Sequence, residues 1–191
     1  MDAIYSPAWS PDGTKILFCG IQGGKLDLFT IDLTTEEITR LTNDFFDEAD
    51  PQWSPDGRRI AFSSDRRDIP YEHRLDDIKD SYDIFVMNAD GSGIIRIAAG
   101  PNNDRQPSWS PDGKNIVFVS DRNGITNLYN VNIDEMTLSP LTNLLTGASS
   151  PSWSPDGNNI AFTCFKDGGW DIFVLKRPLN RELKLENIAP T

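Results

Sequence analysis

Short apolar segments alternate with turn-forming residues along the whole chain. The clearest are runs that begin with isoleucine and end with phenylalanine: Ile16–Phe18, Ile60–Phe62, Ile116–Phe118 and Ile160–Phe162. Aromatic and β-branched residues bounded by Gly, Pro, Asn and Asp are typical of β-strands, and no segment predicts a convincing helix. The central residue of each run is also apolar (Leu17, Ala61, Val117, Ala161). Because a half-solvated strand would carry a polar residue there, the pattern predicts an all-β fold with sheets covered on both faces.

The sequence Pro-x-Trp-Ser-Pro-Asp-Gly stands before each of these runs. Its tryptophans, aspartates and glycines are the predicted structural residues of the repeat: Trp9, Asp12, Gly13, Trp53, Asp56, Gly57, Trp109, Asp112, Gly113, Trp153, Asp156 and Gly157. The tryptophans are 44, 56 and 44 residues apart, and a fixed period in this range indicates a repeat architecture. The longer spacing reflects an insertion in the second repeat, at residues 69–80.

The Ser-Pro-Asp-Gly segment predicts the turn between the first two strands of each repeat. Proline presets φ for the second position of a type I turn, aspartate suits the next position, and glycine adopts the left-handed conformation that closes the hairpin. An alternative role for the four aspartates is a carboxylate ring around a cation. The turn explains them without an ion, so we expect no metal and no cofactor.

Each repeat contains four predicted strands. The first ends at the tryptophan, the second is the Ile-x-Phe run, and the third is Asp83–Met87 or its equivalent. The fourth strands are predicted at Thr39–Thr42, Ile94–Ala98, Leu138–Thr142 and Lys184–Ile188. Four-stranded units covered on both faces are typical of β-propeller blades, here at about 5–46, 47–102, 103–146 and 147–191 of one domain, 1–191. A β-sandwich is the alternative.

The repeat resembles that of the TolB-type β-propeller family, which is similar to WD40 repeats. The resemblance rests on Trp-Ser-Pro-Asp-Gly, on Ile60–Arg66 and on Asp83–Gly91, and it extends over nearly the whole chain. It implies a non-enzymatic scaffold that binds a protein or peptide, with a partner in the cell envelope. Two alternatives are also implied: the propeller part of a hydrolase or peptidase, and a carbohydrate-active enzyme similar to oligogalacturonate lyases.

The number of repeats leaves three arrangements open. Four blades lie at the lower end of the range for propellers, and we favour a closed four-bladed ring. Alternatively, two chains self-associate into a larger ring, or the chain is part of a longer propeller, since the TolB type resembles a six-bladed ring preceded by an α/β domain.

Composition excludes several classes of partner. The net charge of −11 argues against nucleic acid, because phosphate contacts need clustered Lys and Arg. No apolar stretch reaches the roughly 18 residues that span a bilayer. The first residues lack the basic and apolar regions of a secretory signal, which predicts a cytoplasmic protein as given, or a periplasmic or envelope protein if the N-terminus is trimmed.

Residues with reactive side chains are few. His73 is the single histidine, whereas a histidine-based metal site needs several. Cys19 and Cys164 are offset by one residue within their repeats, so they are predicted to face opposite sides of their sheets as free, buried thiols.

The candidate binding face is formed by connections that differ between repeats, because divergent loops are free to carry function. In a propeller, the connections from fourth to first strands share a face with those between second and third strands. The residues predicted to lie there are Asp44, Phe45, Phe46, Asp47, Glu48, Tyr71, His73, Arg74, Asn103, Asp104, Arg105 and Trp170. Aromatic residues among mixed charges suit a protein interface. The alternative interpretation is that Phe45 and Phe46 fill the space between sheets and that the insertion is a solvated loop.

Overall fold

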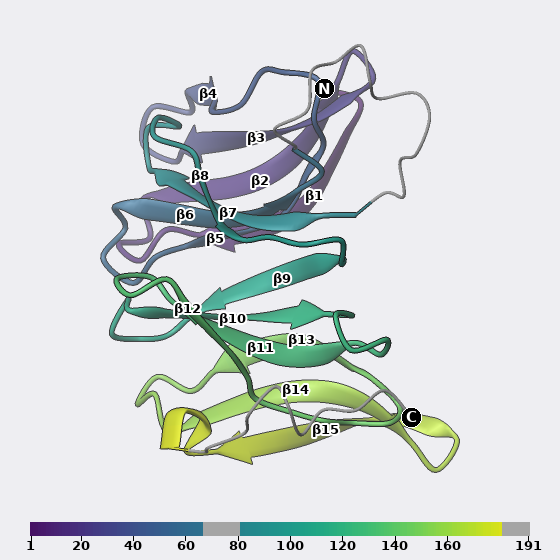
Figure 1. Ribbon diagram of the computed structural model, residues 1–191. Coiled ribbons are helices and arrows are strands. Elements are labelled where there is room, and N and C mark those ends of the chain that lie inside the picture. Colours follow the sequence, from purple (N-terminus) through teal and green to yellow (C-terminus); the bar gives the residue numbers. More distant parts are fainter. Residues whose placement is uncertain (67–80, 181–191) are drawn as a thin grey trace.

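The computed structural model describes residues 1–66 and 81–180, which form four antiparallel sheets (Figure 1). The first sheet contains β1 (Ala3–Trp9), β2 (Lys15–Gln22), β3 (Lys25–Asp32) and β4 (Ile38–Arg40), and the second contains β5 (Glu48–Trp53), β6 (Arg59–Ser64), β7 (Asp83–Asn88) and β8 (Ile95–Ala98). The third contains β9 (Asp104–Trp109), β10 (Asn115–Ser120), β11 (Asn127–Asn132) and β12 (Thr137–Pro140). The fourth contains β13 (Ala148–Trp153), β14 (Asn159–Lys166) and β15 (Gly169–Lys176), followed by a 3-10 turn at Pro178–Asn180.

Within each sheet the strands pair in chain order, so every sheet is a simple meander. Each first strand ends at the motif tryptophan, which pairs with the isoleucine of the second strand, as in Trp53 opposite Ile60. The all-β fold built from TolB-type blades is confirmed. The strand predicted at 184–188 and the insertion at 69–80 lie outside the described residues.

The first strands of the four sheets converge on one axis. β1 contacts β5, β5 contacts β9, and β9 contacts β13. An open pocket of ≈ 300 Å³ lies between them and is lined by the residues around the motif prolines Pro7, Pro51, Pro107 and Pro151. A pocket shared by the same position of all four repeats indicates a radial arrangement of the sheets, as in a propeller.

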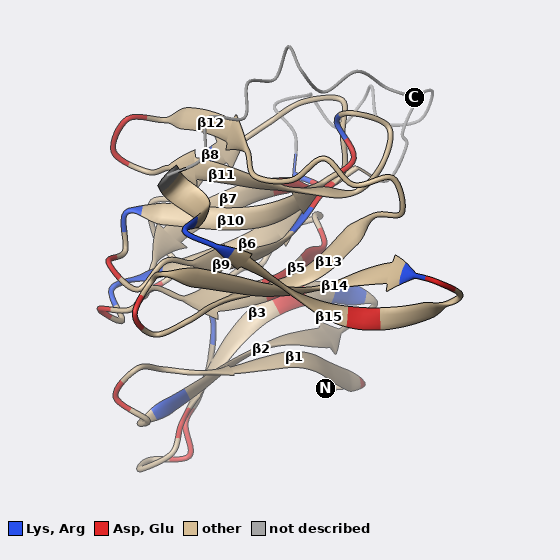
Figure 2. Ribbon diagram, turned by 90° about the horizontal axis from the view of Figure 1, so that it is seen from below, with Lys and Arg blue, Asp and Glu red and all other residues tan. Residues whose placement is uncertain are grey.

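Three apolar clusters join neighbouring sheets. Leu17 and Leu28 of the first sheet pack with Ile60 and Phe62 of the second, and equivalent clusters join the second sheet to the third and the third to the fourth. Charged residues are concentrated in turns and at strand ends, while most of the strand length is uncharged (Figure 2). β6 and β10 are buried along nearly their full length because their sheets are covered on both faces.

The motif aspartates fold back on their own turns. The side-chain oxygen of Asp112 accepts hydrogen bonds from the Ser110 hydroxyl at 2.6 Å and from the Lys114 amide at 3.1 Å. Asp12, Asp56 and Asp156 make the same pair of bonds in their turns. The glycines that follow, Gly13, Gly57, Gly113 and Gly157, have φ between 68° and 71°. These bonds account for the four aspartates without a bound ion.

The favoured closure of four sheets into a ring is not what the structure shows. The first and fourth sheets lie at opposite ends of the stack in Figure 1, and the outer face of the fourth sheet exposes Trp170, Ile172 and Val174. In a closed ring this face would pack on the first sheet. The described residues therefore form an open arc of four blades.

The two cysteines are free and buried, as predicted. Cys19 packs in the cluster that joins its sheet, the first, to the second sheet, which follows it in the chain. Cys164 belongs to the fourth sheet and packs toward the third sheet, which precedes it. They thus lie on opposite faces of their sheets. Burial, together with the charges of Asp50 and Glu48, raises the pKa of the Cys19 thiol to about 12, so this thiol stays protonated.

Candidate functional site

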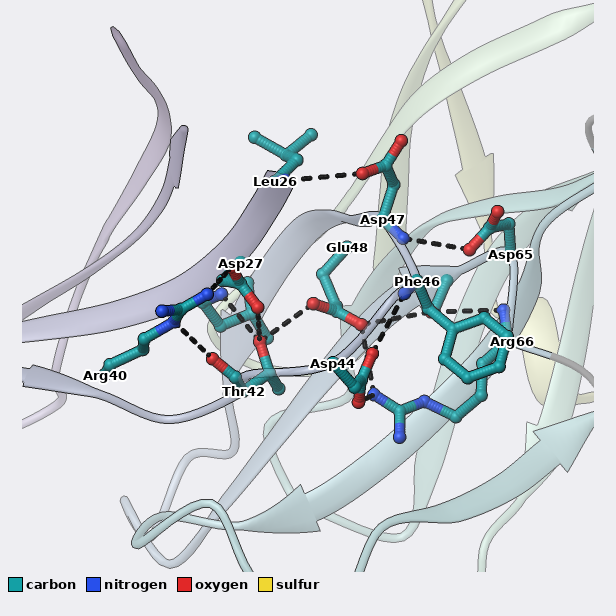
Figure 3. A network of polar contacts seen from close by, with 12 residues as sticks. Leu26, Asp27, Arg40, Thr42, Asp44, Phe46, Asp47, Glu48, Asp65 and Arg66 are labelled. Atoms are coloured by element: carbon teal, nitrogen blue, oxygen red, sulfur yellow. Dashed lines mark hydrogen bonds and ion pairs between the residues drawn. The ribbon is translucent and has the colours of Figure 1, made fainter. Parts of the chain in front are cut away.

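A buried polar network joins the first sheet to the second where β4 leads into β5 (Figure 3). Thr42 is its centre: its hydroxyl accepts a hydrogen bond from the Leu28 amide at 2.9 Å and donates one to Glu48 at 2.8 Å. Arg40 forms an ion pair with Asp27 at 2.5 Å and also donates to the Thr42 carbonyl. Because Asp27 and Glu48 are fully buried, these bonds supply the partners that their carboxylates would otherwise find in water.

Arg66 ties the connection between the sheets to this network. Its guanidinium lies 2.7 Å from the Asp44 carboxylate and 3.1 Å from the Glu48 carboxylate. Asp44 in turn accepts a hydrogen bond from the Phe46 amide, and Asp65 accepts one from the Asp47 amide. The segment 44–48 is therefore held at both ends by side chains that follow β6 (Figure 3).

This anchoring separates the two adjacent phenylalanines. Phe46 is partly buried, with the Arg66 guanidinium 5.2 Å from its ring centroid. Phe45 is 66% exposed, and the Lys25 ammonium lies 3.9 Å from its ring centroid. Phe46 thus packs against the ion-pair network, while Phe45 presents an aromatic ring to solvent.

Burial governs the electrostatics of the network. It raises the pKa of Glu48 to about 7, although the hydrogen bond from Thr42 and the charge of Arg66 both act to lower it. Desolvation likewise raises the pKa of Asp104 and Asp83, against the nearby charges of Arg122 and Arg96. Near neutral pH, Glu48 is therefore poised between its two protonation states.

The third sheet repeats this arrangement. Arg122 forms an ion pair with Asp104 at 2.6 Å, and Thr142 donates a hydrogen bond to Asn127 at 2.8 Å. Arg66 and Arg122 end the two Ser-Asp-Arg segments of the sequence and pair with the first residue of β5 or β9 in their own sheet. The repetition indicates that these ion pairs build the blades.

The structure corrects the placement of two predicted binding-face residues. Glu48 and Asp104 have no exposed surface, because β5 and β9 begin at these residues rather than after them. They support the predicted binding face from within. Asp44, Asp47, Asn103 and Arg105 keep some exposure, and Arg105 stacks over the Tyr82 ring at 3.5 Å.

The remaining predicted residues are not brought together. Trp170 lies on the hairpin of the fourth sheet, where its ring meets Phe165 edge-on at 5.6 Å, whereas Phe45 lies between the first and second sheets. Tyr71, His73 and Arg74 lie outside the described residues.

The sequence did not predict the unusual backbone of four residues near the axis. Ser6, Asp50, Gln106 and Ser150 each precede a motif proline and have φ between 49° and 56°. This left-handed backbone is uncommon for residues other than glycine. The backbone amide of Gln106 donates a hydrogen bond to the Asp50 carboxylate at 3.2 Å. The side-chain oxygen of Gln106 accepts one from the backbone amide of Ser150 at 2.7 Å. Their position directly before the motif proline is the signal that could have identified them.

The repeat and the radial sheets agree with a family model. The model described as TolB beta propeller domain matches residues 2–77 and 74–144. The chain belongs to the TolB β-propeller family. One relative, the Tol-Pal system protein TolB of Bordetella pertussis, is 31% identical over 134 residues, which cover 70% of this chain and 28% of the relative. The chain thus spans less than a third of that TolB protein.

Solved structures agree on the fold. TolB from Acinetobacter baumannii superposes with a TM-score of 0.72 and 24% identity, covering 92% of this chain and 41% of that one. An oligogalacturonate lyase in complex with manganese superposes with a TM-score of 0.66 and 20% identity, covering 93% of this chain and 52% of the lyase. At these identities the similarity concerns the fold alone.

Neither a metal-binding cluster nor a membrane-spanning helix occurs in the described part of the chain. Within residues 1–66 and 81–180, no group of three or more His, Cys, Asp or Glu side chains is arranged to hold a metal ion. The same part of the chain has no helix long and apolar enough to cross a membrane.

Proposed function

We propose that this chain is the blade-bearing part of a TolB-like scaffold whose connection face binds a protein or peptide and catalyses no reaction. The connection face consists of Lys25, residues 44–47 and Asp65. The observation that carries the proposal is the position of Phe45. It is exposed, yet the segment that bears it is fixed by the ion pairs of Arg66 with Asp44 and Glu48.

A rigidly held exposed aromatic ring suits an interface anchor. Aromatic residues are enriched at binding hot spots, and a preorganised loop loses little conformational entropy when a partner docks. Asp44 and Asp47 flank the two phenylalanines in the sequence, Asp65 accepts a hydrogen bond from the Asp47 amide, and the whole chain carries a net charge of −11. The proposed partner segment therefore has an apolar side chain that packs on Phe45 and positive charges beside it.

The family supports the class of partner. The relatives are named as proteins of the Tol-Pal system, so we propose a partner within such a system and a location in the cell envelope. The similarity to the manganese-bound lyase supports only a shared fold, and no described cluster of side chains favours lyase chemistry.

The test is an isothermal calorimetric titration of the purified chain with the purified Pal protein of the same cell. Phe45→Ala is expected to weaken binding about tenfold or more, the loss typical of a hot-spot residue. Leu33→Ala is the matched control, because Leu33 is an exposed apolar residue in the turn between β3 and β4. Wild-type affinity in Phe45→Ala, with the fold intact by circular dichroism, would reject the connection face as the binding site.

A further inference from the structure

One rule describes all three contacts between neighbouring sheets. The motif tryptophan of the second, third and fourth sheets packs on the sheet before it. Trp109 of the third sheet packs with Ala61, Ile84 and Val86 of the second. Trp53 packs in the cluster of the first and second sheets, and Trp153 in that of the third and fourth.

The face that receives a tryptophan uses fixed positions of the third strand. One of them, directly after an aspartate or asparagine, is Leu28 in β3, Ile84 in β7 and Leu128 in β11, and all three are fully buried. The same position in β15 is Ile172, which is 78% exposed. Trp170 and Val174 flank it at alternate positions of the strand, so they project from the same face and are also exposed.

Neighbouring β14 residues extend this open face. The register places Ala161 opposite Val174, Thr163 opposite Ile172 and Phe165 opposite Trp170. Directly opposed residues share a face in an antiparallel pair. Five of these six side chains are apolar, and the Thr163 hydroxyl is hydrogen-bonded to Ser149, so the fourth sheet presents a largely apolar surface of the kind that is covered in the other three.

The opposite end of the arc exposes the complementary element. Trp9 of the first sheet is 65% exposed, whereas Trp109 is 5% exposed. Trp9 occupies the same position of the motif as Trp109, but none of the sheets that the structure describes packs over it.

From these two ends we propose that the open face of the fourth sheet binds the first sheet of a second copy of this chain. Trp9 of one copy then packs near Ile172 of the other, as Trp109 packs near Ile84 within the chain. The occupant is argued from continuity, since this tryptophan-on-sheet contact already occurs three times in the molecule. The two surfaces differ, so the association is head-to-tail and forms a ring where the rotation closes and a linear assembly where it does not.

The experiment is sedimentation equilibrium of the 191-residue chain over a range of concentrations, with two variants. We expect the wild-type mass to rise to twice that of one chain or more. Trp9→Glu alone and Ile172→Glu alone are expected to stay monomeric, because each lacks one of the two surfaces. An equimolar mixture of them is expected to form a dimer, because each supplies the surface that the other lacks.

Met136→Glu is the control for adding a charge at an exposed apolar residue. Glu36 already occupies the equivalent turn position with φ of 59°, close to the 52° of Met136, so the substitution suits the backbone and is expected to leave association unchanged. A wild-type chain that remains monomeric overturns the proposal. Dimerisation of Trp9→Glu on its own also overturns it, because that result requires two fourth sheets to pack on each other.

Discussion

Ile84 and Ile172 occupy the same position of the repeat, but Ile84 is fully buried and Ile172 is 78% exposed. Both follow the aspartate of an Asp-Ile-Phe segment, and both pair with the second strand of their own sheet. The difference arises outside the sheet: the third sheet covers Ile84, and no described sheet covers Ile172. Their burial thus reports directly where the arc of blades ends.

The first prediction compares these two residues. Ile84→Ala is expected to lower the free energy of unfolding by about 2–5 kcal/mol, because it removes buried methyl groups and leaves a cavity. Ile172→Ala is expected to change it by no more than about 0.5 kcal/mol, as for most surface substitutions. Urea denaturation of dilute protein measures both. Equal losses in the two variants would show that Ile172 is also packed within a single chain.

The second prediction concerns Glu48 and pH. Its pKa is raised from 4.5 to about 7 in the folded protein, so the folded state retains a proton that the unfolded state releases. The stability that this group contributes is present below pH 4.5 and is lost as the pH rises toward 7. Glu48→Gln is expected to remove the contribution of Glu48 to the pH dependence of the free energy of unfolding, which is at most about 1.4 kcal/mol per pH unit. Denaturant unfolding at several pH values measures it, and parallel profiles for the two proteins would contradict the assignment.

The third prediction tests Arg66 as the partner of a buried charge. Arg66→Ala is expected to destabilise the fold by about 1–2 kcal/mol near pH 8, because Glu48 loses its cationic partner and, with a folded pKa of about 7, takes up a proton instead at a cost of about 1.4 kcal/mol per pH unit. The exposed Arg58 is the control, and Arg58→Ala is expected to have an effect within about 0.5 kcal/mol.

A double variant separates charge from packing at this site. The cost of Arg66→Ala is expected to be smaller in the Glu48→Gln background, where no buried charge remains to be paired. The same cost in both backgrounds would mean that Arg66 acts through its contacts with Phe46 and Asp44 instead.

The fourth prediction concerns the motif aspartates. Asp112→Ala is expected to cost about 1 kcal/mol through the lost bonds from Ser110 and Lys114, whereas Asp112→Asn retains an acceptor oxygen and costs less. Thermal unfolding with and without EDTA completes the test. A melting temperature that falls on chelation would indicate that the aspartates hold a cation after all.

Acid unfolding gives an independent check on the same turns. The hydrogen bond from Ser10 lowers the pKa of Asp12 from 3.8 to about 2, and Ser154 has the same effect on Asp156. Groups with lowered pKa values stabilise the fold above pH 3.8 and lose this effect as the pH falls toward 2. Alanine variants of Ser10 and Ser154 should therefore reduce the pH dependence in this acidic range.

Most of the fold could be predicted because its signals are local. The apolar residue between Ile60 and Phe62 indicates a strand covered on both faces, and Ser54–Gly57 carries its own turn chemistry. These features depend on residues adjacent in sequence, and the radial arrangement follows from their repetition.

The end of the arc could not be predicted, because exposure depends on a neighbouring sheet. Asp-Ile-Phe at 171–173 has the same sequence as at 83–85, and nothing local distinguishes a covered sheet from an open one. A similar limit applies to Glu48. A carboxylate in an acidic connection suggests a solvated residue, and its burial depends on Arg66, eighteen positions further along the chain.

The candidate binding face was predicted only in part for a related reason. Phe45 and Phe46 are identical neighbours, so the sequence alone cannot show which of them packs on Arg66 and which faces solvent. The prediction that both share a face with Trp170 was based on the strand connections that bear these residues, and connection type does not show which side chains touch: the Trp170 ring packs on Phe165 of the last sheet.

The most direct test of the open arc is the rate of thiol labelling at one repeat position. Leu28→Cys, Ile84→Cys, Leu128→Cys and Ile172→Cys place a cysteine in each third strand, while the native Cys19 and Cys164 are buried. In dilute, monomeric protein we expect rapid labelling at residue 172 and protection of the other three until the protein unfolds. Protection of residue 172 equal to that of residue 84 would show that the four sheets close on themselves, and it would contradict the open arc.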